Sequence, residues 1–88
     1  MNEKDILFKL QEWLLDEIGA EMVSSTRYLE TGDLDSFHVI IFVSYIENTF
    51  GIRLQLEELQ NKNFNTLGGL AKYIYDLTMQ DKFHKRKP

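Results

Sequence analysis

The sequence predicts an all-α protein, a four-helix bundle with three longer helices and one short helix, and with a long loop between the first two helices. Three segments repeat apolar residues at spacings of three and four, which is typical of amphipathic helices. A chain of 88 residues can bury one small core. We therefore expect one domain over residues 1–80, followed by a basic, disordered tail over residues 81–88.

The first predicted helix runs from Asn2 to about Gly19, where a glycine is a natural helix end. Residues 20–35 lose the helical period and are rich in Ser, Thr, Gly and Asp. They predict a long ordered loop held by Tyr28 and Leu29, and loops of this length commonly carry function. The apolar residues of the first helix are Ile6, Leu7, Leu10, Trp13, Leu14 and Ile18.

The second predicted helix is capped by Asp35 or Ser36, runs to about Phe50 and is apolar on most sides. Its β-branched residues would also suit a strand, but fifteen residues exceed the usual strand length and Gly51 follows as a stop. For Phe37 and Ile40 we expect partial burial. One face gathers Val39, Phe42, Val43, Ile46 and Phe50.

Two further helices are predicted in the last third of the chain. A short one spans Leu56 to Asn61, with Leu56 and Leu59 directed inward. The last one is amphipathic, although Gly68 and Gly69 weaken its first turn by roughly 1 kcal/mol each relative to Ala. Its apolar positions are Leu67, Leu70, Ala71, Ile74 and Leu77.

Charge and composition exclude several classes of partner. Four of the ten cations lie in the last seven residues, which leaves six Lys/Arg against fourteen Asp/Glu before them. An acidic body repels nucleic acid and favours basic protein surfaces, so we expect protein partners and no nucleic acid. No apolar run approaches membrane-spanning length and no signal peptide or cysteine is present. We therefore expect a soluble, cytoplasmic monomer that does not bind membranes.

The sequence from Gly32 to Phe37 joins the long loop to the most apolar helix. Ser36 would present its hydroxyl, exposed, at the helix N-terminus, beside the acidic Asp35. No histidine is placed to act as its base, so Ser36 would be a weak nucleophile. It is better suited as the substrate of another enzyme, because free N–H groups of a first turn favour an attached phosphate. His38 and His84 lack ligand spacing, so we expect neither a metal site nor an enzyme.

The stretch from Tyr28 to Ile52 resembles the acyl carrier protein and peptidyl carrier protein family. The hallmark of that family is Asp-Ser-Leu at the start of the second helix, which here reads Asp35-Ser36-Phe37. The resemblance extends from the first helix to about residue 78. Further matching positions are Tyr28, Leu29, Glu30 and Gly32 before the triplet, Phe50-Gly51-Ile52 after the helix, and Thr66-Leu67-Gly68.

The resemblance implies a defined cofactor and set of partners. A phosphopantetheinyl transferase would move a 4′-phosphopantetheine arm from coenzyme A onto Ser36, with Asp35 and Phe37 completing the motif. The arm would carry an acyl or aminoacyl group as a thioester. A loading enzyme would attach that group, and acyl-transferring or modifying enzymes would receive it downstream.

The second helix departs from the fatty-acid carriers, which are similar in fold but more acidic there. We expect its outward positions to be His38, Ile41, Tyr45 and Asn48, with only Glu47 acidic. The chain therefore looks more like free-standing carriers that serve an AMP-forming acyl or amino acid ligase in a specialised biosynthetic pathway. Tyr45→Glu should then weaken binding to the loading enzyme more than it changes stability. The predicted partner-binding residues are His38, Ile40, Ile41, Tyr45 and Glu47.

One alternative from another class stays open at this point. A helical interaction domain could share the carrier fold without being modified, and its apolar second helix would then be a permanent protein interface. Phosphopantetheine transfer onto the purified protein separates the two interpretations.

Overall fold

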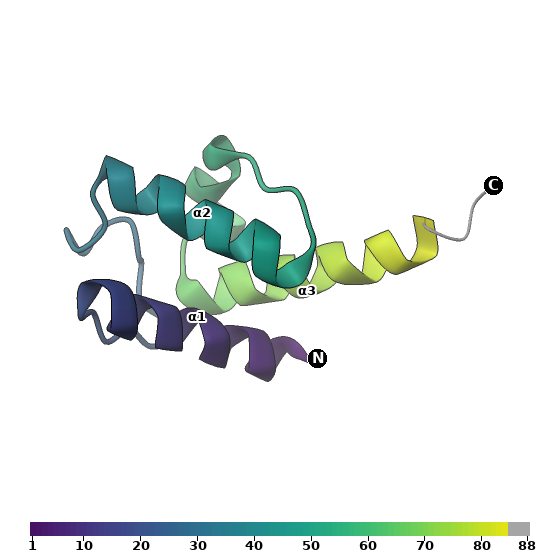
Figure 1. Ribbon diagram of the computed structural model, residues 1–88, viewed down its shortest axis with the longest axis horizontal. Coiled ribbons are helices and arrows are strands. Elements are labelled where there is room, and N and C mark those ends of the chain that lie inside the picture. Colours follow the sequence, from purple (N-terminus) through teal and green to yellow (C-terminus); the bar gives the residue numbers. More distant parts are fainter. Residues whose placement is uncertain (85–88) are drawn as a thin grey trace.

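The computed structural model describes residues 1–84, with side chains described to residue 80. This part of the chain is all-helical, which confirms the predicted fold class. The predicted tail, residues 81–88, lies outside the described side chains, and the domain boundary at residue 80 stays a prediction. The elements are α1 (Glu3–Ile18), α2 (Ser36–Phe50), the 3₁₀ helices η1 (Leu56–Gln60) and η2 (Lys62–Phe64), and α3 (Leu67–His84) (Figure 1).

Local signals set the ends of α1. Asn2 and Asp5 form a capping box, in which the Asp5 N–H donates to Asn2 Oδ1 at 2.9 Å and the Asn2 N–H donates to Asp5 Oδ2 at 3.1 Å. These bonds satisfy two N–H groups that the first turn leaves free. Gly19 ends the helix at φ 68°, a left-handed conformation that glycine adopts without steric penalty.

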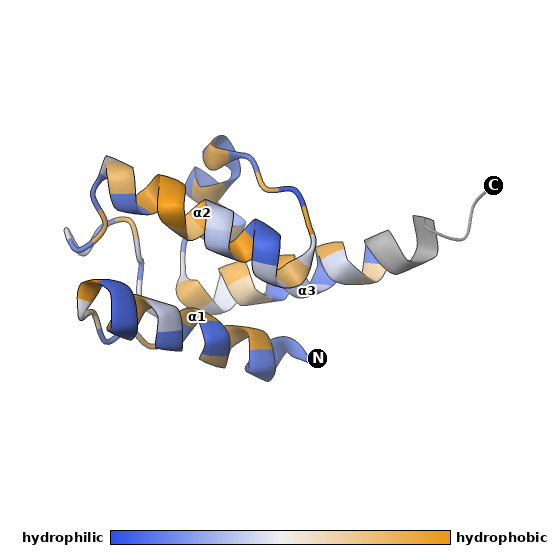
Figure 2. Ribbon diagram, in the orientation of Figure 1, coloured by the Kyte–Doolittle hydropathy of each residue, from blue (hydrophilic) through white to orange (hydrophobic). Residues whose placement is uncertain are grey.

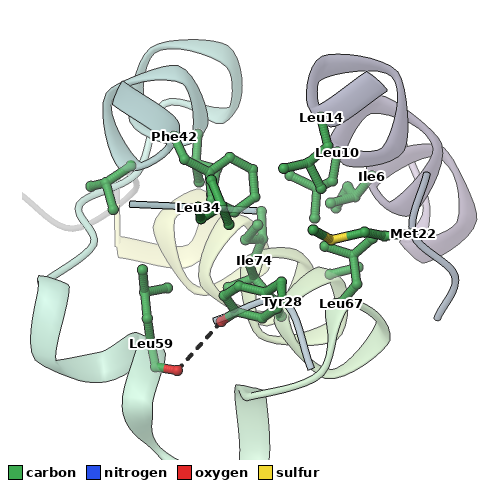
Figure 3. Close-up of a cluster of buried hydrophobic side chains, with 14 of the residues drawn as sticks. Ile6, Leu10, Leu14, Met22, Tyr28, Leu34, Phe42, Leu59, Leu67 and Ile74 are labelled. Carbon is green, nitrogen blue, oxygen red and sulfur yellow. Dashed lines mark hydrogen bonds between the residues drawn. The ribbon is translucent and has the colours of Figure 1, made fainter. Parts of the chain in front are cut away.

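The core lies where the three α-helices and the loop between α1 and α2 meet. Tyr28, from that loop, is buried in the centre, and its ring meets Phe42 of α2 edge-on with centroids 6.1 Å apart (Figure 3). The loop is therefore part of the core, in agreement with the prediction that Tyr28 holds it. Figure 3 labels Ile6, Leu10, Leu14, Met22, Leu34, Leu59, Leu67 and Ile74 in the same cluster.

The loop is also hydrogen-bonded to the start of α3. The N–H of Leu67 donates to Thr26 O at 2.9 Å, and that of Gly68 to Ser24 O at 2.8 Å. A Cβ on Gly69 would lie 2.7 Å from the backbone oxygen of Asn63, and one on Gly68 would lie 3.1 Å from the backbone oxygen of Ser24. The two glycines that weaken the first turn of α3 thus allow close approach to neighbouring segments, most clearly at Gly69.

α2 begins at the end of the bundle remote from both the N-terminus and the end of α3 (Figure 1). Its first half is the most continuously hydrophobic stretch of helix in Figure 2. Even so, none of the helices in the described part of the chain is long and apolar enough to cross a membrane.

Candidate functional site

The start of α2 is fixed by Asp35, the N-cap residue. Its Oδ1 accepts a hydrogen bond of 2.8 Å from the backbone N–H of His38. The Nδ1 of the His38 ring lies 2.8 Å from the same oxygen, so an N–H at Nδ1 also donates to it. Leu34, buried beneath the loop, anchors the chain just before the cap. Asp35 is therefore held in position by both the backbone and the side chain of one residue.

The same contacts favour the ionised form of the Asp35 carboxyl group. The backbone N–H of His38, and next the His38 side chain, hold the pKa of Asp35 below its ordinary value. Donors that bond to the charged form of a carboxyl group stabilise that form. A negative charge thus lies beside the residue that follows it, Ser36.

Ser36 is the first residue of α2, and its side chain is exposed. Among the described residues, no hydrogen bond holds its hydroxyl, and the ring of His38 faces Asp35 instead. A serine hydroxyl that has no hydrogen bond to a base is poorly activated as a nucleophile. The backbone N–H groups of a first helical turn do suit an attached phosphate. The arrangement therefore fits a serine that another enzyme modifies.

A groove of about 390 Å³ opens beside Ser36. Its walls come from the loop before α2, from α2 itself and from η1, so three separate segments meet there. Most of the side chains are apolar, which suits the carbon skeleton of an attached group. The lining residues are Leu29, Leu34, Asp35, Ser36, Val39, Ile40, Leu56, Leu59 and Gln60.

Three large apolar side chains of α2 and η1 are exposed, and two of them, Ile40 and Leu56, line the groove. Phe37 is 65 %, Ile40 54 % and Leu56 46 % exposed. The expected partial burial of Phe37 and Ile40 was wrong, as was the inward direction of Leu56; of the predicted pair only Leu59 is buried. The reason is that Leu59 is the apolar side chain of η1 that enters the core, which leaves Leu56 at the surface beside the groove.

The outward side of α2 is rotated relative to the one expected from the sequence. Four of its exposed positions, Phe37, Ile40, Ser44 and Asn48, recur at three and four residues and hence share one side of the helix. Ile41 and Tyr45 are half-buried. This outward side carries no charged residue.

Two predicted partner-binding residues make bonds within the molecule. The Tyr45 hydroxyl donates to Lys9 O of α1 at 3.2 Å. Glu47 is half-buried, and its Oε2 accepts from the backbone N–H of Leu54 at 2.9 Å. Glu47 thus fastens the segment after α2 to the helix. Contact of Tyr45 and Glu47 with a partner stays a prediction.

Sequence reasoning missed the contribution of η1 to the site. Leu56 and Gln60 line the groove with Ser36, although about twenty residues separate them in the chain. No periodicity or motif indicates this proximity, because it depends on the path of the chain between α2 and η1.

A small bundle that presents an exposed serine at a helix start, beside an apolar groove, fits the carrier class of protein. Comparison with known proteins agrees with this. Residues 9–74 match the family described as Phosphopantetheine attachment site. The acyl carrier protein of Streptococcus thermophilus (strain CNRZ 1066) is 35 % identical over 72 residues, which cover 80 % of this chain and 92 % of that protein. The acyl carrier protein of Streptococcus pyogenes serotype M3 is 34 % identical over 68 residues, or 75 % and 86 % of the two chains.

The chain belongs to the phosphopantetheine-binding carrier protein family. Its members carry a covalent 4′-phosphopantetheine on a serine and are carriers, not catalysts. The protein is therefore a phosphopantetheine carrier and not an enzyme. Carriers of this kind work with a phosphopantetheinyl transferase and with acyl-handling enzymes.

Proposed function

We propose that Ser36 is the residue that bears the phosphopantetheine arm. The observation that carries this is the exposed hydroxyl of Ser36 at the first position of α2, beside an apolar groove. In the transfer, the Ser36 oxygen would form a phosphodiester as the phosphoanhydride bond of coenzyme A breaks. The serine proton would be lost and adenosine 3′,5′-bisphosphate would leave. When bound, the arm supplies the thiol that holds an acyl or aminoacyl group as a thioester.

The residues around Ser36 have separate roles in this proposal. Asp35 fixes the helix start and holds a negative charge there, and the first-turn N–H groups face the new phosphodiester. Phe37, Ile40 and Leu56, which we call the apolar rim, would contact the enzymes that approach Ser36. An uncharged outward side of α2 favours partners that bind through apolar contacts.

Two finer expectations are part of the proposal. The loading enzyme would be an AMP-forming acyl or amino acid ligase, and the pathway a specialised biosynthetic one in the cytoplasm. What supports this is that α2 lacks an acidic outward side, since Glu47 is bonded to Leu54. The alternative, an unmodified interaction domain, would use the apolar rim as a lasting interface.

Intact-mass measurement tests the attachment residue. The purified protein is incubated with coenzyme A, magnesium and a promiscuous phosphopantetheinyl transferase. The wild type should gain one phosphopantetheine and Ser36→Ala none. Ser44→Ala, which removes another exposed serine of α2, should be modified like the wild type. Modification of Ser36→Ala would reject the assignment, and a wild type that gains no mass would favour the interaction domain.

A further inference from the structure

Leu59 belongs both to the groove beside Ser36 and to the core. It lines the groove and is fully buried. Its carbonyl oxygen lies 3.5 Å from the hydroxyl of Tyr28 (Figure 3). The same hydroxyl donates to Phe64 O at 2.6 Å, so Tyr28 holds η1 and η2 together from inside the core. Burial raises the pKa of Tyr28 well above its ordinary value, which keeps the hydroxyl protonated as a donor.

A second tyrosine holds the same segment from α3. The ring of Tyr73 stacks on Phe64 with centroids 3.9 Å apart and planes 13° from parallel. Its hydroxyl donates to Glu58, whose other oxygen accepts from the Gln55 N–H at 2.8 Å. We call the Tyr28 and Tyr73 hydroxyls, with their acceptors on residues 58, 59 and 64, the tyrosine clasp.

We propose that the tyrosine clasp closes the core to the cargo, so that this carrier holds a short acyl or aminoacyl group outside the bundle and does not shelter a long hydrocarbon chain. The inference rests on attachment at Ser36. A chain that enters the core from the groove must displace Leu59. That movement would take Leu59 O, one of the two acceptors near the Tyr28 hydroxyl, out of its place in a dry interior and would disturb the segment that Tyr28 holds through Phe64 O. Every buried side-chain polar atom in the described part of the protein has a partner.

The groove itself is a poor shelter for a long cargo. It is open at the surface, and Asp35, Ser36 and Gln60 contribute polar atoms to it. Since Ser36 lines the groove, the arm would begin there and would occupy that space itself. An aminoacyl or short acyl group does not need to be hidden from water, because it has little apolar surface.

Thioester protection tests the proposal. The transferase is given butyryl- or octanoyl-coenzyme A, and the loaded carriers are confirmed by mass. Cleavage by hydroxylamine and the melting temperature are then measured. For the octanoyl-loaded wild type we expect a rate of thioester cleavage within about twofold of the rate for octanoyl-coenzyme A. The butyryl-loaded and octanoyl-loaded wild type should have equal melting temperatures. In Tyr28→Phe the ring packing remains but both hydroxyl contacts are lost. Cleavage of the octanoyl thioester should then slow at least threefold, and the octanoyl-loaded variant should melt at a higher temperature than the butyryl-loaded variant.

Two further variants complete the experiment. Tyr73→Phe keeps the stack on Phe64 and should move in the same direction as Tyr28→Phe, even if Tyr28→Phe does not fold. Tyr75 is half-buried and lies on α3, as Tyr73 does. Tyr75→Phe should behave as the wild type. If the wild type protects its octanoyl thioester from hydroxylamine, this inference is overturned while attachment at Ser36 stands. The same follows if neither Tyr73→Phe nor a folded Tyr28→Phe protects the octanoyl thioester better than the wild type does. A wild type that gains no mass would overturn the attachment at Ser36 as well.

Discussion

The ring of Tyr45 lies against the indole of Trp13, with centroids 5.5 Å apart and planes 23° from parallel. Trp13 also stacks on Phe42 at 5.1 Å. Together with the bond from the Tyr45 hydroxyl to Lys9 O, these contacts join α2 to α1. Tyr45 is therefore part of the seam between two helices, and burial raises its pKa above the ordinary value for tyrosine.

Replacement of Tyr45 should reduce stability more than the sequence suggested. Tyr45→Glu loses the stack and brings a charge against α1, so we expect the free energy of unfolding to fall by about 1–3 kcal/mol. Tyr45→Phe keeps the stack and loses only the hydroxyl bond, a loss of roughly 1 kcal/mol. Urea unfolding measures both values. A fully stable Tyr45→Glu variant that fails only in partner binding would restore the sequence-based prediction.

Asp35 should make stability depend on pH in the acid range. Its pKa in the folded protein is lowered, chiefly by the His38 backbone N–H, from an ordinary value of 3.8. The stabilisation is therefore complete above that value and is lost as the pH falls from there through the lower folded pKa. Asp35→Asn can still cap the helix but does not titrate. The urea midpoint should fall more steeply for the wild type than for Asp35→Asn as the pH is lowered from 7 to 2. Parallel curves of midpoint against pH for the two proteins would contradict the expectation.

Glu47 should contribute to stability through the backbone N–H of Leu54. Glu47→Ala removes the acceptor at 2.9 Å and leaves that N–H without its partner. We expect the free energy of unfolding to fall by about 1–3 kcal/mol. Asn48→Ala, the neighbouring exposed position, should change it by less than about 0.5 kcal/mol. Equal stability of the two variants would mean that the Glu47 bond contributes nothing.

The apolar rim should matter for partners and not for folding. Ile40 is 54 % exposed, so Ile40→Ser should leave the melting temperature nearly unchanged. The kcat/KM for modification by the transferase should fall about tenfold, equivalent to about 1.4 kcal/mol. Asn48→Ala, on the same side of α2 but further from Ser36, serves as the control. An unchanged kcat/KM for Ile40→Ser would rule out this contact.

Gly69→Ala should destabilise the protein although alanine is the better helix former. The added Cβ would lie 2.7 Å from Asn63 O, a backbone atom that cannot move alone. We expect a loss of about 1–3 kcal/mol from the overpacking, against a gain of about 1 kcal/mol from helix propensity. Thermal unfolding decides between them, and a higher melting temperature for the variant would show that propensity dominates.

Much of the fold could be predicted because its signals are local. The period of Ile6, Leu10 and Leu14 located α1, and Gly19 and Gly51 marked the ends of α1 and α2 at φ near 70°. The buried Phe42, Val43 and Ile46 confirm the predicted inner face of α2. The single short helix was predicted less well, because 3₁₀ turns such as η1 and η2 have no distinct apolar period.

By itself, the sequence determined the helices, their ends, and the position of Asp35-Ser36-Phe37 at a helix start, because each of these depends on residues a few positions apart. Only the tertiary structure decided which side of α2 faces outward. That helix is apolar on most sides, so its pattern does not distinguish a side covered by Trp13 from one open to solvent. The same holds for the Tyr28 hydroxyl, whose acceptor Phe64 O lies 36 residues further along the chain. It also holds for Glu47, whose donor Leu54 is brought to it by the turn after α2.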